Sequence, residues 1–106
     1  MKIGILISQT EPETVWNAFR FANFSLDKGH TVKVFLIGKG VECGEIEDRK
    51  FDVKSQTEKF LEKKGKILAC GTCLKSRNKE GSEVCPISSM ADLMQIVEES
   101  DKIISF

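Results

Sequence analysis

The chain has 106 residues, close to the commonest size of a single domain, which leaves no room for two independent hydrophobic cores. Sixteen basic residues balance sixteen acidic ones, so the chain lacks the excess positive charge that draws a protein to nucleic acid or anionic lipid. No apolar run reaches the roughly 18 to 20 residues that cross a bilayer, and the first residues enter a strand pattern instead of a signal peptide. We therefore expect a cytoplasmic protein with no direct nucleic-acid partner and no membrane partner.

Strand and helix patterns alternate along the first third of the chain. Residues 2–8 form a short apolar run, which predicts a strand covered by helices on both faces. Residues 11–28 carry apolar side chains at helical spacing, with Pro12 in the opening turn and Gly29 as the stop. Residues 31–37 are rich in β-branched and aromatic side chains, which predicts a second strand.

The helix predicted over residues 11–28 has more apolar surface than one face of a sheet covers. Trp16, Phe21 and Phe24 lie outside its main apolar stripe. We expect these rings either to contact another subunit or to lie under a neighbouring loop.

The middle of the chain combines turn signals with a charged segment. Residues 38–40 predict a turn, because their glycine spacing matches no nucleotide-binding motif, and residues 41–52 predict a loop with at most a short turn of helix. The Ser-Gln-Thr-Glu stretch at residues 55–58 fits a capping box, which predicts a helix over residues 55–64. A third strand is predicted over residues 66–70.

The last third of the chain predicts four more elements. These are a short helix over residues 72–78, a short fourth strand over 83–85, a helix over 89–100 and a fifth strand over 102–106. Strands that alternate with helices pair in parallel through right-handed crossovers. The predicted fold class is therefore α/β: a three-layer α/β/α sandwich with a mainly parallel sheet of about five strands.

Cys70 stands at the carboxyl end of the third predicted strand, where parallel α/β sheets collect reactive groups. Gly71 permits close approach of the backbone, and Thr72 and Cys73 fall in the first turn of the next helix. Free backbone amides stabilise a thiolate there, and a second thiol at this spacing can attack a disulfide or persulfide on the first. Cys70 is thus the predicted nucleophile and Cys73 its supporting thiol, the alternative being that both are buried packing residues.

Several features together resemble a known family. They are the order of elements, the strand Val34 to Ile37 followed by Gly40 and Val41, Cys70 at a strand end with Leu74 and Arg77 beyond it, and a late Ser-Met-Ala-Asp-Leu helix. On these residues the chain is similar, over nearly its whole length, to the DsrE/DsrF-like family, which includes the sulfur-relay subunit TusD. The resemblance implies one DsrE/F-like domain over residues 1–106.

The resemblance also implies a function. In that family the cysteine matching Cys70 carries sulfane sulfur as a persulfide and passes it to a partner protein, without a cofactor. The implied activity is therefore that of a sulfurtransferase of the carrier type, with donor and acceptor proteins as partners and a homo-oligomer, a trimer or hexamer, as the assembly. Cys73 is not part of the relay pattern, so we expect it to regulate or release the sulfur.

Three other functions fit parts of the sequence. Cys70 and Cys73 have the spacing of one zinc knuckle, but Cys43 and Cys85 are isolated and complete no tetrahedral set, so we predict no metal site. A thioredoxin-like dithiol oxidoreductase would use Cys70 and Cys73, although their motif follows the third strand instead of the first. The last alternative is a non-catalytic oligomeric module.

Overall fold

Five parallel strands form the central sheet of this protein, whose computed structural model describes residues 1–82 and 85–106. The strands lie in the order β4-β3-β2-β1-β5, and every neighbouring pair is parallel. Their bounds are β1 Lys2–Ile7, β2 Thr31–Leu36, β3 Lys66–Cys70, β4 Ile87–Ser88 and β5 Lys102–Ser105. The parallel sheet of five strands predicted from the sequence is confirmed.

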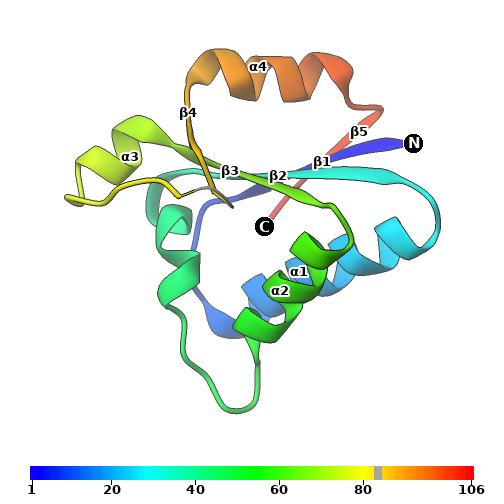
Figure 1. Cartoon of the computed structure of the whole chain (residues 1–106), viewed down its shortest axis with the longest axis horizontal. Helices are drawn as coiled ribbons and strands as arrows, with labels where there is room; N and C mark the ends of the chain where they lie inside the picture. The colour runs from blue at the N-terminus through cyan, green and yellow to red at the C-terminus, as the bar shows by residue number, and fades with distance from the viewer. Residues whose placement is uncertain (83–84) are drawn as a thin grey trace.

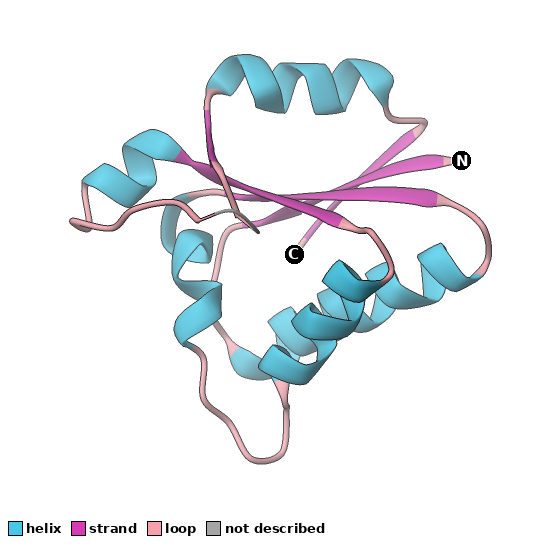
Figure 2. Cartoon of the chain, viewed as in Figure 1, coloured by secondary structure: helices cyan, strands magenta, loops and turns pink. Residues whose placement is uncertain are grey.

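Helices cover both faces of the sheet (Figures 1 and 2). Helices α1 (Pro12–Asp27) and α2 (Val53–Glu62) pack together on one face, and α4 (Met90–Glu99) lies across the other. Helix α3 (Gly71–Lys75) continues outward from the end of β3, next to the 3-10 helix η1 (Gly38–Glu45). The predicted three-layer α/β/α architecture is therefore confirmed, with α3 and η1 placed at the carboxyl edge of the sheet. No helix among the described residues is long and apolar enough to cross a membrane.

The ends of α1 follow from local chemistry. The carboxylate of Glu11 accepts hydrogen bonds from two backbone N–H groups of the first turn, and Pro12 occupies the first helical position, where its missing N–H costs nothing. At the other end Gly29 adopts φ +89°, and the N–H of His30 donates to the carbonyl of Ser25 at 3.1 Å. This Schellman arrangement ends the helix where the sequence predicted.

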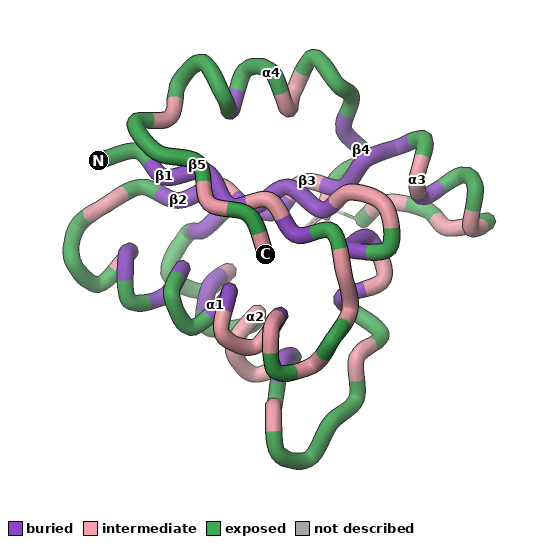
Figure 3. The backbone as a smooth tube through the Cα atoms, turned by 180° about the vertical axis from the view of Figure 1, so that it is seen from behind, coloured by how far each residue is buried: buried purple, intermediate pink, exposed green. Residues whose placement is uncertain are grey.

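The core lies between the sheet and the α1–α2 layer (Figure 3). Phe19 of α1 and Phe60 of α2 meet edge to face with their ring centroids 5.8 Å apart. Full burial of each such ring stabilises the fold by about 2–3 kcal/mol. Side chains below 2 % exposure surround them: Ile5, Ile7, Val15, Val34 and Phe35.

Several predicted bounds differ from those of the structure. The helix predicted over residues 72–78 is α3, which ends at Lys75. Helix α2 begins at Val53, two residues before the expected start at Ser55, because the carboxylate of Asp52 accepts the backbone N–H of Ser55 and caps the helix. The expected strand at 83–85 falls partly on Glu83 and Val84, which lie outside the described residues, while Cys85 lies in a bend. Strand β4 follows Pro86 instead, where backbone N–H groups become available for the ladder.

The segment after β2 is more regular than predicted. Residues 38–45 form η1, where the sequence predicted a turn followed by a loop. A Cβ atom on Gly40 would lie 2.0 Å from the carbonyl oxygen of Ile7, so only glycine lets η1 pack directly against the end of β1. This close approach brings the start of η1 to the carboxyl edge of the sheet.

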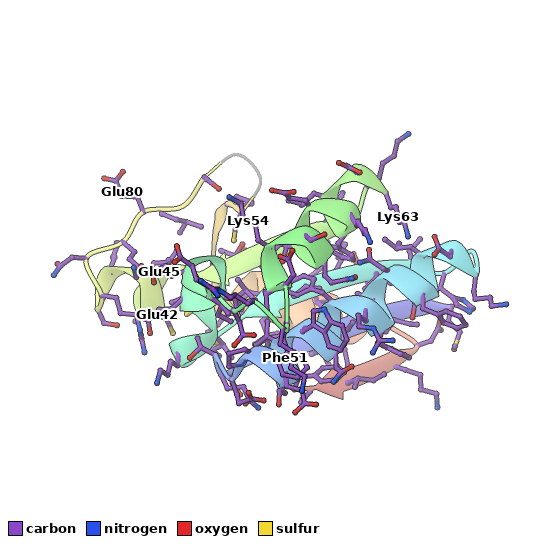
Figure 4. All side chains as sticks on the ribbon, turned by 90° about the horizontal axis from the view of Figure 1, so that it is seen from below. Glu42, Glu45, Phe51, Lys54, Lys63 and Glu80 are labelled. Carbon is purple, nitrogen blue, oxygen red and sulfur yellow. The ribbon has the colours of Figure 1, made fainter. Side chains whose placement is uncertain are left out.

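The surplus aromatic rings of α1 have different surroundings. Trp16 packs on Phe51 of the loop between η1 and α2, with ring centroids 5.3 Å apart, and the Arg20 guanidinium lies 4.4 Å from the Trp16 ring (Figure 4). Phe21 and Phe24 stay 38 % and 59 % exposed. The loop therefore covers one of the three rings.

Candidate functional site

Cys70 occupies the junction between strand and helix at the carboxyl edge of the sheet. It is the last residue of β3, pairs with Ser88 of β4, and is the N-cap residue of α3 with φ −58° and ψ 118°. A Cβ atom on Gly71 would lie 2.7 Å from Cγ2 of Ile87, so glycine at this position lets β4 pack closely beside the turn. The chain thus changes from strand to helix at the cysteine itself.

The Cys70 sulfur is buried but well supplied with hydrogen-bond donors. The residue is 3 % exposed, and burial by itself raises the pKa of a thiol. The Cys73 side chain and the backbone N–H groups of Cys73 and Thr72 counteract burial, and together they hold the pKa of Cys70 below the ordinary value of 9.0. These groups therefore favour the thiolate form of Cys70 more than its buried position alone would.

Cys73 links the Cys70 sulfur to η1. Its own sulfur accepts a hydrogen bond from the backbone N–H of Gly38 at 3.2 Å, and Gly38 adopts φ +56°, which glycine tolerates. Cys73 thus contacts η1 through Gly38, and its side chain also lowers the pKa of Cys70. The structure thus brings together Cys70 and Cys73, the two site residues predicted from the sequence.

Arg77 fixes the outer end of α3. Its guanidinium donates to the carbonyl of Cys73 at 3.1 Å and pairs with the carboxylate of Glu42 of η1 at 3.3 Å. The arginine therefore holds α3 to η1, and with it the backbone of Cys73. No local pattern predicts the partners Gly38 and Glu42, because each lies 35 residues from its contact.

The other two cysteines lie elsewhere. Cys43 and Cys85 line an apolar cavity of about 270 Å³ on the α1–α2 side of the sheet. Burial, reinforced by Cys85, raises the pKa of Cys43 to about 12, and burial also raises the pKa of Cys85. Both groups are protonated at neutral pH. Within residues 1–82 and 85–106 no three histidine, cysteine or acidic side chains are grouped so that they could hold a metal ion.

Comparisons with known proteins agree on one family and one fold. The model of the DsrE/DsrF-like family matches residues 1–106. An uncharacterized protein of Methanopyrus kandleri is 33 % identical over 98 % of this chain and 93 % of its own, and one of Methanocaldococcus jannaschii is 28 % identical over the whole of both chains. The YchN protein of Escherichia coli superposes with a TM-score of 0.84 at 18 % identity over both full chains. A conserved protein of unknown function from Bacteroides thetaiotaomicron gives 0.78 at 20 % identity, over 99 % of this chain and 94 % of its own.

Proposed function

Because this chain belongs to the DsrE/DsrF-like family, we propose that it handles sulfane sulfur, which it accepts on Cys70 as a persulfide and passes on. The observation that carries the proposal is the position of Cys70 at the end of β3 and the start of α3, where Cys73 and the backbone N–H groups of Thr72 and Cys73 lower its pKa despite burial. A thiolate, and not a thiol, is the nucleophile in sulfur exchange. A cysteine used only for packing needs no such donors.

The proposed reaction is an exchange between sulfur atoms. The Cys70 thiolate attacks the outer sulfur of a donor persulfide, R–S–SH. The donor's S–S bond breaks, its electron pair leaves as the donor thiolate R–S⁻, and Cys70 becomes Cys70–S–SH. An acceptor thiolate then repeats the exchange on the outer sulfur, which restores Cys70. No external oxidant, reductant or cofactor takes part, because the sulfane sulfur keeps its oxidation state.

Cys73 offers a second outcome from the same intermediate. Its thiolate can attack the inner sulfur of Cys70–S–SH, which forms a Cys70–Cys73 disulfide and releases hydrosulfide. The two thiols are then oxidised while the sulfane sulfur is reduced. The Cys73 side chain is close enough to Cys70 to lower its pKa, which favours this dithiol route as the second candidate function.

The proposed function requires partners. We propose a protein donor and a protein acceptor of sulfur, and a homo-oligomeric assembly, a trimer or hexamer, in the reducing cytoplasm where thiols persist. Since Cys70 is only 3 % exposed, sulfur transfer to or from a protein requires a local rearrangement of the residues around it.

Intact-mass spectrometry after incubation with a small persulfide tests the proposal. The wild-type chain should gain one sulfur atom, the Cys70→Ser variant should gain none, and the Cys85→Ser control should match the wild type. Loss of two hydrogens without added sulfur would favour the dithiol route. Uptake by Cys70→Ser at the wild-type level would overturn the role of Cys70.

A further inference from the structure

A cavity of about 570 Å³ lies at the amino edge of the sheet, the end opposite Cys70. It is bounded by the starts of β1, β2 and β3 and by the carboxyl ends of α1, α2 and α4. The sulfur chemistry proposed above uses none of these residues. Ligands in parallel α/β sheets usually bind at the carboxyl edge, so this cavity is separate from the ordinary site of the fold.

The lining of this cavity is strongly cationic. Five lysines line it together with His30: Lys2, Lys33, Lys63, Lys64 and Lys66. The two carboxylates in the lining are already paired with lysines, Glu99 with Lys33 at 3.0 Å and Asp27 with Lys63 at 2.8 Å. Within the described part of the chain, the other three lysines have no carboxylate within ion-pair distance. A chain of zero net charge thus concentrates positive charge at one concave site.

Stabilisation of helix ends accounts for only some of the lysines in this cavity. Lys63 and Lys64 follow the end of α2, where cations favour the helix dipole. Lys2, Lys33 and Lys66 belong to strands, where no such role exists. These lysines also act on Glu99. Hydrogen bonds from Lys33 and Gln95, together with the charges of Lys33 and Lys2, lower its pKa.

The floor of the cavity is apolar. Ile3 and Val32 are buried at 5 % and 4 % exposure, and Leu26 of α1 is half-buried beside them. The cavity lining therefore combines apolar side chains, on which an organic group can pack, with lysines at the amino edge of the sheet. Its volume lies within the roughly 300–1,000 Å³ of small-molecule sites.

We propose that this cavity binds a phosphate-bearing organic anion of nucleotide size. Lysine ammonium groups bind phosphate oxygens through charge-assisted hydrogen bonds. Lys2, Lys64 and Lys66, which have no acidic partner among residues 1–82 and 85–106, match a ligand with several negative charges. The apolar floor formed by Ile3, Val32 and Leu26 accommodates the organic part of the ligand. The proposal is independent of Cys70.

An NMR titration of the full chain with ADP, and separately with inorganic pyrophosphate, tests whether this cavity binds such an anion. ADP should shift the backbone amide signals of Gly29, Thr31, Val32 and Lys66, and it should bind more tightly than pyrophosphate because only ADP carries an organic group. The Lys64→Gln, Lys66→Gln double variant should weaken ADP binding about tenfold, since two nearby charges are lost. Neither lysine pairs with a carboxylate in the described residues, so the fold should persist.

The matched control is the Lys54→Gln, Lys59→Gln double variant, which removes two charges from α2 outside the cavity lining. Lys54 lies at the start of α2, away from Lys63 at its end (Figure 4). Control binding should equal that of the wild type. Equal weakening in both double variants, or signal shifts spread over lysines elsewhere, would overturn the site. Pyrophosphate binding as tightly as ADP would overturn the role of the apolar floor.

Discussion

The Cys73 side chain lowers the pKa of Cys70. Replacing Cys73 with alanine removes this side-chain effect but leaves burial in place, so the pKa of Cys70 should rise. The alkylation rate of Cys70, measured against pH, should therefore reach its midpoint at a higher pH in Cys73→Ala. The Cys85→Ala variant should keep the wild-type midpoint, and an unchanged midpoint in Cys73→Ala would show that its thiol does not act on Cys70.

Cys43 should make the fold sensitive to alkali. Its folded-state pKa is raised to about 12, so above pH 9 the unfolded chain loses the thiol proton while the folded chain keeps it. The unfolding free energy should then fall by about 1.4 kcal/mol per pH unit between these two values. Urea denaturation of Cys43→Ala should give a shallower alkaline decline than the wild type. Parallel declines in the two proteins would contradict a buried, protonated Cys43.

Among the elements, η1 can pack against the end of β1 only because residue 40 is glycine. A methyl group on Gly40 would clash with the backbone of Ile7, which cannot move without breaking the β1–β2 ladder. Gly40→Ala should therefore destabilise the fold by about 3 kcal/mol, the upper range for overpacking. The added methyl group of Gly44→Ala meets no atom of the described residues within 4 Å, so this variant should change stability by less than about 0.5 kcal/mol. Thermal denaturation of both variants tests this, and equal losses would contradict the explanation.

Predictability from the sequence differed between elements for physical reasons. Strands β1, β2, β3 and β5 and helix α1 could be predicted because periodicity, Pro12 and Gly29 are local signals. The start of α2 could not be predicted, because Asp52 and Ser55 are both good capping residues. In the structure Asp52 is the N-cap. Cys70 could be placed at a strand end by the same local reasoning. Its connection through Cys73 to Gly38 arises only when the chain folds.

For the whole molecule, the exposed apolar side of α4 is the candidate surface for self-association. Met90, Met94 and Val97 recur at helical spacing and are 58 %, 56 % and 47 % exposed, and Ile103 of the edge strand β5 is 42 % exposed. Helix α1 has two exposed large apolar side chains, Phe21 and Phe24. An apolar surface of this kind marks an interface more often than a solvent-facing one.

Light scattering coupled to size exclusion tests this assignment. Met94→Lys should shift the proposed oligomer toward monomer, because a charge would be buried in the interface. Gln95→Lys adds the same charge to the neighbouring exposed position and should leave the assembly intact. A monomeric wild-type chain, or equal dissociation of both variants, would remove α4 as the interface.

The packing of Trp16 on Phe51 gives the molecule an intrinsic optical probe. The chain has one tryptophan and no tyrosine, so its near-ultraviolet fluorescence comes from Trp16 alone. Because that ring touches Phe51 and the Arg20 guanidinium, a shift in its emission reports the loop between η1 and α2 moving away from α1. The absence of tyrosine also leaves alkaline absorbance titrations of the cysteines free of phenolate signal.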